Sequence, residues 1–159
     1  MASPNESTLE DVTLDWFRGL GYAVAHGPDL APGEAKAERS SYGDVVLTGR
    51  LRTALHRLNP GVAQDALEEA YRQVMLAESP SLVSLNRRFH SQLMNGVSVE
   101  CLPSPSGRGA GCEGLRWEHV KLIDFNDPTA NDWLALNQLT VIENHHNRRM
   151  DVVVYVNGL

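Results

Sequence analysis

The sequence lacks the features that would mark a membrane, secreted or nucleotide-binding protein. No stretch of its 159 residues approaches the roughly 20 consecutive apolar residues of a transmembrane helix. Its first residues, MASPNESTLEDV, are polar and acidic and contain neither the basic nor the apolar segment of a secretory signal. There is no P-loop, nucleophile elbow or dinucleotide-binding glycine pattern, so we expect neither ATP nor a nicotinamide cofactor on this polypeptide.

Cysteine and positive charge are also scarce. The two cysteines, Cys101 and Cys112, are too few for a disulfide framework and have no second pair at zinc-finger spacing. This favours free thiols and a cytoplasmic protein. The formal net charge of −6 argues against a surface that coats nucleic acid electrostatically. It leaves room for a local basic patch, or for a site that reaches DNA through metal ions.

Two adjacent histidines, His145 and His146, lie near Glu143 and invite comparison with a zinc site. Adjacent side chains on an extended segment point to opposite faces, so this pair cannot easily chelate one ion. We therefore assign no zinc site to this segment.

What is present is an ordinary globular composition, 42% hydrophobic and 21% charged, in a length that suggests one domain. Apolar residues at helical spacing predict a helix over 7–20. Ser7 and Glu10 would form a capping box at its start. The apolar face of this helix would consist of Leu9, Val12, Trp16 and Leu20.

The rest of the chain divides into a helical part, which ends near residue 95, and a mainly β part over about 97–159. We expect further helices at about 43–58, 62–77 and from Pro80 to Asn95. We expect strands at 22–25, 97–102, 117–125, once or twice within 133–142, and at 150–156. This order predicts an α/β (α+β) fold with a central mixed sheet flanked by helices.

The last nine residues, from Asp151 to Leu159, are the most informative. Residues 152–156, Val-Val-Val-Tyr-Val, read as a buried strand, and Asn157-Gly158 is the strongest short signal for a two-residue hairpin. A hairpin needs a second strand, yet only Leu159 remains. The sequence therefore suggests a domain truncated within a structural unit.

Four segments carry a family resemblance. The last of them is the most specific, because IDFNDPTANDW, NQLTVIE and NRRMDVVVYVNGL follow one another in it without interruption. In order and spacing, over nearly the whole chain, the four resemble the N-terminal region of the restriction (R, HsdR-type) subunit of type I restriction–modification enzymes. They are LEDVTLDWFRGLGY (9–22), LTGRLRTALHRLNP (47–60), LNRRFHSQLMNGVSVE (85–100) and the stretch over 120–159.

The resemblance implies a nuclease of the PD-(D/E)xK type with a restriction-endonuclease-like core. In that family an Asp heads one strand of a hairpin, and a Glu-x-Lys lies on the next strand. The Asp corresponds to Asp151, although Met150 stands where the family usually has Pro. The Glu-x-Lys strand and the ATP-driven motor lie outside this sequence, so we expect the fragment itself to be inactive.

The resemblance also implies chemistry and partners. The intact protein would hydrolyse DNA phosphodiesters with Mg²⁺, which one or two carboxylates hold together with several waters. ATP is expected only on the motor. The partners would be DNA and the modification and specificity subunits of the same complex.

Two acids are candidate catalytic residues. Asp151 would be the first metal ligand, the alternative being an aspartate that caps a turn. Glu10 lies where the nuclease superfamily often has an acid on the first helix that faces the metal, the alternative being the helix cap.

Other polar residues receive weaker predictions. Arg148 and Arg149 could contact DNA phosphates or form an ordinary solvated pair. We expect Gln138 to serve in packing or in a hydrogen bond. Arg87 and Arg88 would lie on a solvated helix face.

A different class of function fits the acidic charge as well. The three helices of 43–95 could form a non-catalytic docking module of a larger assembly. In either case the unpaired edge of strand 150–156 could recruit a second copy of the chain, giving a homodimer.

Overall fold

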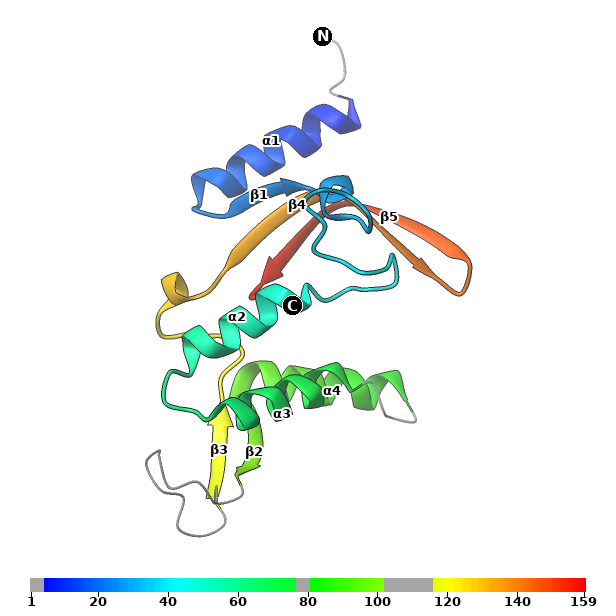
Figure 1. Ribbon diagram of the computed structural model, residues 1–159. Coiled ribbons are helices and arrows are strands. Elements are labelled where there is room, and N and C mark those ends of the chain that lie inside the picture. The colour runs from blue at the N-terminus through cyan, green and yellow to red at the C-terminus, as the bar shows by residue number, and fades with distance from the viewer. Residues whose placement is uncertain (1–4, 77–80, 102–115) are drawn as a thin grey trace. The chain divides into compact units, whose positions relative to one another are not determined.

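The computed structural model describes residues 5–76, 81–101 and 116–159, which fall into two compact units (Figure 1). The first unit is built from residues up to 51 together with 131–159, and the second from 52–130. The described residues form four α-helices and a mixed β-sheet, which confirms the predicted fold class. No helix among them is both long and apolar enough to cross a membrane. Cys112 and the side chain of Cys101 lie outside the described residues.

The first unit is a three-stranded sheet with a helix on it. Its sheet has the order β1-β4-β5, with β1 parallel to β4 and β4 antiparallel to β5. Its elements are α1 (Glu6–Gly19), β1 (Ala23–His26), the 3-10 helix η1 (Gly27–Leu30), β4 (Trp133–Glu143) and β5 (His146–Val156). The core of this unit consists of Leu30, Leu47, Leu134, Leu136, Leu139 and Tyr155.

One tight turn fixes the register of β4 against β5, and a second follows the end of β5. Asn144 and His145, both with positive φ, join β4 to β5 in the geometry that suits the twist of a hairpin. Asn157 and Gly158 also have positive φ, and Val156 and Leu159 exchange both backbone hydrogen bonds at 3.0 Å. The predicted Asn-Gly turn is therefore formed.

Helix α1 confirms the predicted span but not the predicted cap or apolar face. Its N-cap is Asn5, whose side chain accepts a hydrogen bond from the Thr8 N–H, so Ser7 and Glu10 form no capping box. The predicted face is 56–66% exposed, and the helix instead buries Glu10 and Leu14. Apolar spacing failed here because the sheet offers a polar partner to Glu10.

The segment 31–47, where we expected the start of a helix at 43, is an irregular connection. The helix α2 (Thr48–Leu58) begins later, because the Leu47 N–H bonds the Gly158 carbonyl at 2.8 Å. The buried guanidinium of Arg39 donates to the carbonyls of Tyr42, Asp44 and Thr140. These bonds hold the connection against β4, where Tyr42 also accepts from the Ile142 N–H.

Arg50 ties the same connection to the start of β4. Its guanidinium forms ion pairs with Glu38 and Asp132, at 2.5 and 2.9 Å. The hydrogen bonds from Glu38 and Asp132 raise the pKa of Arg50 above its ordinary value, so the group stays charged.

The second unit pairs helices with a two-stranded antiparallel sheet. Buried apolar side chains of α3, β2 and β3 include Leu67, Val97 and Val120. The strand predicted over 117–125 is wrong beyond Val120. There the Asn59 side chain forms hydrogen bonds with both the N–H and the carbonyl of Lys121, so these groups are not available to a neighbouring strand. The elements are the rest of α2, α3 (Gln64–Met75), α4 (Leu82–Asn95), β2 (Val97–Cys101), β3 (Arg116–Val120) and the 3-10 helix η2 (Pro128–Ala130).

Candidate active site

The Glu10 carboxylate is the centre of a polar cluster in the first unit. Glu10 lies in the second turn of α1 and is only 6% exposed. Its Oε2 accepts a hydrogen bond from Asn137 Nδ2 at 3.2 Å, and its Oε1 accepts one from Gln138 Nε2 at 2.5 Å. Buried carboxylates need such donors, because desolvation without them costs several kcal/mol (about 1–3 or more). Two consecutive residues of β4 therefore bind one carboxylate.

Gln138 achieves this through an unusual backbone. Successive side chains of a strand normally alternate between faces, so Asn137 and Gln138 would point apart. Gln138 instead has φ of 56°. A left-handed residue with a side chain costs roughly 1–2 kcal/mol, and such strain concentrates at functional sites. The core pattern shifts at this point, with Leu136 and Leu139 both buried on either side of the pair.

Asn137 extends the cluster to His26 at the end of β1. Its Oδ1 lies 2.8 Å from Nδ1 of His26. Because Asn137 donates to Glu10 through Nδ2, its Oδ1 accepts, and this assigns a proton to Nδ1 of His26. The result is a chain of hydrogen bonds from His26 through Asn137 to Glu10.

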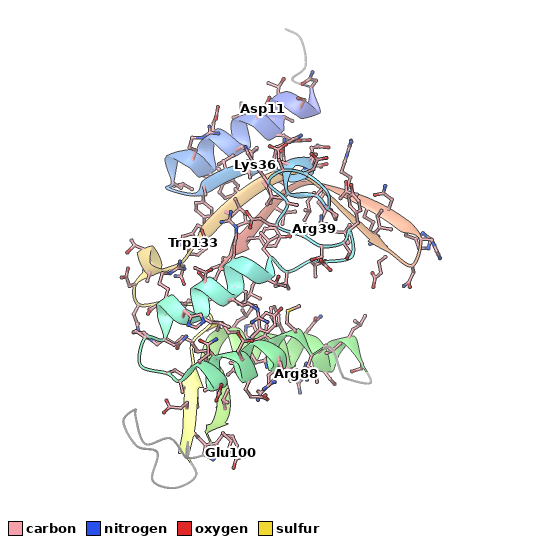
Figure 2. All side chains as sticks on the ribbon, viewed as in Figure 1. Asp11, Lys36, Arg39, Arg88, Glu100 and Trp133 are labelled. Atoms are coloured by element: carbon pink, nitrogen blue, oxygen red, sulfur yellow. The ribbon has the colours of Figure 1, made fainter. Side chains whose placement is uncertain are left out.

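A pocket of about 370 Å³ opens beside this chain of hydrogen bonds. Its charged lining carries both signs. Figure 2 shows two of these residues, Asp11 on α1 and Lys36 on the connection after η1. The polar residues that line the pocket are Asp11, Arg18, His26, Asp29, Lys36 and Asn137.

Along the backbone of β5, Asp151 lies at the position opposite Gln138 of β4. The flanking register pairs are Asn137 with Val152 and Leu139 with Met150, which leaves Gln138 opposite Asp151. The Asp151 side chain is exposed, and in the described part of the chain no group forms a hydrogen bond or ion pair with its carboxylate. The turn-capping alternative finds no support, since Asp151 lies within β5 rather than at its end.

Asp151 offers an exposed carboxylate that a magnesium site could use. Mg²⁺ accepts one or two carboxylates and keeps several waters, and an exposed carboxylate such as that of Asp151 meets the first requirement. The described residues contain no group of three or more His, Cys, Asp or Glu side chains that could hold a metal. Gln138 binds Glu10 through its side chain, and its backbone lies opposite that of Asp151 in the β4–β5 register.

The two candidate DNA-binding arginines lie two and three residues before Asp151 on β5. Arg148 and Arg149 are exposed and pair in register with Val141 and Thr140, toward the turn of the β4–β5 hairpin. Neither forms an ion pair with another described residue. Their guanidinium groups are thus open to solvent or to a phosphate.

Sequence reasoning missed Asn137 and His26. A signal for Asn137 was present, because a polar amide in the middle of the apolar run from Trp133 to Ile142 needs a partner. His26 gave no signal, since only the parallel pairing of β1 with β4 brings it to Asn137. The hydrogen bond predicted for Gln138 is confirmed, and its partner is Glu10.

Comparison with known proteins agrees with the resemblance read from the sequence. A family model described as the type I restriction enzyme R protein N terminus matches residues 3–159. The chain is 32% identical, over 95% of its length, to a putative type I restriction enzyme MjaIXP endonuclease subunit of Methanocaldococcus jannaschii. It is 30% identical, over 98% of its length, to the type I restriction enzyme HindI endonuclease subunit of Haemophilus influenzae. It spans 14% of the length of each relative.

Proposed function

The chain belongs to the family of type I restriction enzyme R protein N termini, and on this premise we propose that it supplies the DNA-cleaving part of such an endonuclease subunit. The reaction would be Mg²⁺-dependent hydrolysis of DNA phosphodiesters. The observation that carries the proposal is the place of Asp151, an exposed residue of β5 whose backbone lies opposite Gln138, the residue that binds the buried Glu10.

The chain's own residues would have separate tasks. A bound Mg²⁺ supplies an activated water and stabilises charge on the phosphoryl oxygens. Asp151 would hold this cation through one carboxylate oxygen. Glu10 would be a second acid, and its two amide donors fix the orientation of its carboxylate.

The second ligand strand of the family would fit at the outer edge of β5. The Asn157-Gly158 turn directs any residues that follow Leu159 back along this edge, because Val156 and Leu159 already pair. A Glu-x-Lys on that strand would then lie beside Asp151. On this proposal residues 1–159 alone do not cleave DNA, and Mg²⁺-dependent nicking of a plasmid by them would contradict it.

The same premise gives the proposed partners. These are DNA, through Arg148 and Arg149, and the modification and specificity subunits of one complex in the cytoplasm, with ATP bound by a motor elsewhere in the subunit. In residues 1–159 alone, this outer edge of β5, at the end of the sheet order, would instead be open to pairing with a second copy.

Substitution of Asp151 tests the proposal. In the full-length subunit, assembled with its partners, we expect Asp151→Ala to lower plasmid cleavage by at least about 100-fold, since even groups that only support a metal ligand contribute about 10–100-fold. ATPase activity and assembly should stay unchanged. Asp15→Ala is the matched control, because Asp15 is an exposed aspartate of the same unit whose ion pair, among the described residues, is with Arg18 on its own helix. Normal cleavage by Asp151→Ala would overturn the proposal.

A non-catalytic docking module is the second candidate. In its favour, α4 has no buried residue and exposes Leu82, Val83 and Met94 by 77, 72 and 53%. Exposed apolar side chains in such number are typical of an interaction face. Unchanged cleavage by Asp151→Ala, together with lost assembly after Leu82→Gln and Val83→Gln, would favour this function.

A further inference from the structure

We propose that Gln138 is a positioning residue of the site, whose left-handed backbone turns its amide onto Glu10 at the strand position that faces Asp151. The inference rests on the proposed nuclease function and deepens it. It assigns to Gln138 the task of orienting one acid relative to the other.

The direction of the Gln138 side chain supports this positioning role. Regular alternation along β4 would put Gln138 on the face of Leu134 and Leu136, which are 1% and 0% exposed in the core. An amide among these leucines would be desolvated without a partner. The φ of 56° removes it from that face, and its Nε2 reaches Glu10 instead. The strained backbone thus accompanies a specific contact.

The neutral charge of the two groups that donate hydrogen bonds to Glu10 also supports this role. Glu10 is held by two neutral amides, and among the described residues it has no ion pair. An arginine or lysine in the same place would cancel the negative charge of the carboxylate. Amide donors fix both oxygens and leave that charge available to a cation. This arrangement suits an acid that works beside a metal ligand.

Asn137, the other residue that binds Glu10, is itself held in place by hydrogen bonds. Its Oδ1 accepts from His26 while its Nδ2 donates to Glu10, so both ends of this amide are engaged. Gln138 therefore supplies the second of two bonds to a carboxylate whose first bond is anchored in β1. Loss of the Gln138 amide frees one carboxylate oxygen and leaves the other in place.

The test replaces Gln138 by glycine, which accepts a left-handed backbone without strain and removes the whole side chain, its amide included. In the assembled full-length protein we expect Gln138→Gly to raise the Mn²⁺ concentration for half-maximal cleavage, and to weaken Mn²⁺ binding measured by electron paramagnetic resonance, each by about 10–100-fold. The thermal midpoint should change little, because relief of the left-handed backbone strain offsets the lost hydrogen bond to Glu10. A purely structural Gln138 would give the reverse, a lower midpoint with unchanged cation dependence.

A double-mutant cycle asks whether Gln138 acts through Glu10. We expect Glu10→Gln combined with Gln138→Gly to lose no more cleavage than Glu10→Gln alone, because both changes disrupt one interaction. Additive losses would overturn the inference. If the glycine variant fails to fold, Gln138→Asn gives the same test, since asparagine also tolerates φ above zero but is one methylene too short.

The outcome for Asp151→Ala separates this inference from the proposed function. Normal cleavage by Asp151→Ala would contradict the proposed nuclease function itself. If Asp151→Ala loses cleavage but Gln138→Gly keeps a normal cation dependence, only the role assigned to Gln138 is contradicted.

Discussion

At the scale of single residues, buried polar side chains decide where irregular segments of this protein go. Among the described residues, every buried side-chain nitrogen or oxygen has a hydrogen-bond partner. Arg39 is 4% exposed, yet all its bonds go to backbone carbonyls rather than to a carboxylate (Figure 2). Asn157 is fully buried and bonds both Asp132 and Asn131. Polar contacts of this kind fix chain paths that apolar packing alone would leave open.

The pH dependence of stability near Asp44 follows from such contacts. The Ser41 hydroxyl, with the N–H groups of Ser41 and Ser40, holds the pKa of Asp44 below its ordinary value. Because the folded pKa is depressed, the carboxylate stabilises the fold fully above the unfolded pKa of about 3.9 and loses this effect as pH falls through the folded pKa. We expect Asp44→Asn to destabilise the chain at pH 6 and less so at pH 3, in urea denaturation.

Ser41→Ala is the matched control for Asp44. Removing the hydroxyl should move the pKa of Asp44 upward, toward the ordinary value, in an NMR titration. A carboxyl of Asp44 that titrates at or above the ordinary aspartate range in the unchanged protein would contradict the argument.

At the scale of elements, one turn and one helix start depend on each other. The Gly158 carbonyl accepts from the Leu47 N–H, and the Leu47 carbonyl accepts the first bond of α2, from Leu51. The turn after β5 therefore sets where α2 begins. This dependence explains why a helix predicted from residue 43 starts at Thr48.

Substitution of two glycines that both have positive φ distinguishes the cost of backbone strain from the cost of a close contact. Gly158 has φ of 85°, and a Cβ there would lie 2.5 Å from the Leu47 carbonyl oxygen. Gly33 has φ of 91° with nothing within 4 Å. We expect Gly33→Ala to cost about 1–2 kcal/mol from backbone strain, and Gly158→Ala about 1–3 kcal/mol more from overpacking. Equal losses in urea denaturation would show that the contact with Leu47 relaxes freely.

At the scale of the whole molecule, the net charge of this chain limits how it would contact DNA in the proposed function. A net charge of −6 gives little general attraction for a polyanion. The exposed arginines of the β4–β5 hairpin are local exceptions, and a metal ion would be another. Binding to DNA should therefore depend on few phosphate contacts.

The salt dependence of binding measures these contacts. Each neutralised phosphate adds about 0.9 to the slope of log K against log salt. For the full-length protein, we expect the double change Arg148→Ala and Arg149→Ala to reduce the slope by about 2, in fluorescence anisotropy with duplex DNA. The adjacent pair Arg87 and Arg88 on α4 is the matched control, and its replacement should leave the slope unchanged. If both arginine pairs changed the slope equally, Arg148 and Arg149 of the hairpin would have no specific role in DNA binding.

Local patterns in the sequence determined much of this fold. The helices α3 and α4, the span of α1 and the Asn157-Gly158 turn follow from periodicity, caps and turn residues, because each depends on neighbours within a few positions. The resemblance to the R-subunit family was readable for the same reason, since its segments are continuous in sequence. The identity of Asp151 as a candidate ligand came from that resemblance, and its role stays a prediction.

Only the tertiary structure decided the surroundings of Glu10. From the sequence, Glu10 was equally a cap and an acid of the site, and Leu9, Val12 and Trp16 were the buried face. The fold contradicts the cap and the apolar face, because Asn137 and Gln138, 127 and 128 residues away, offer hydrogen bonds that outweigh apolar burial on that side of α1. Contacts at such separation depend on how β4 lies under α1, which no local pattern of residues encodes.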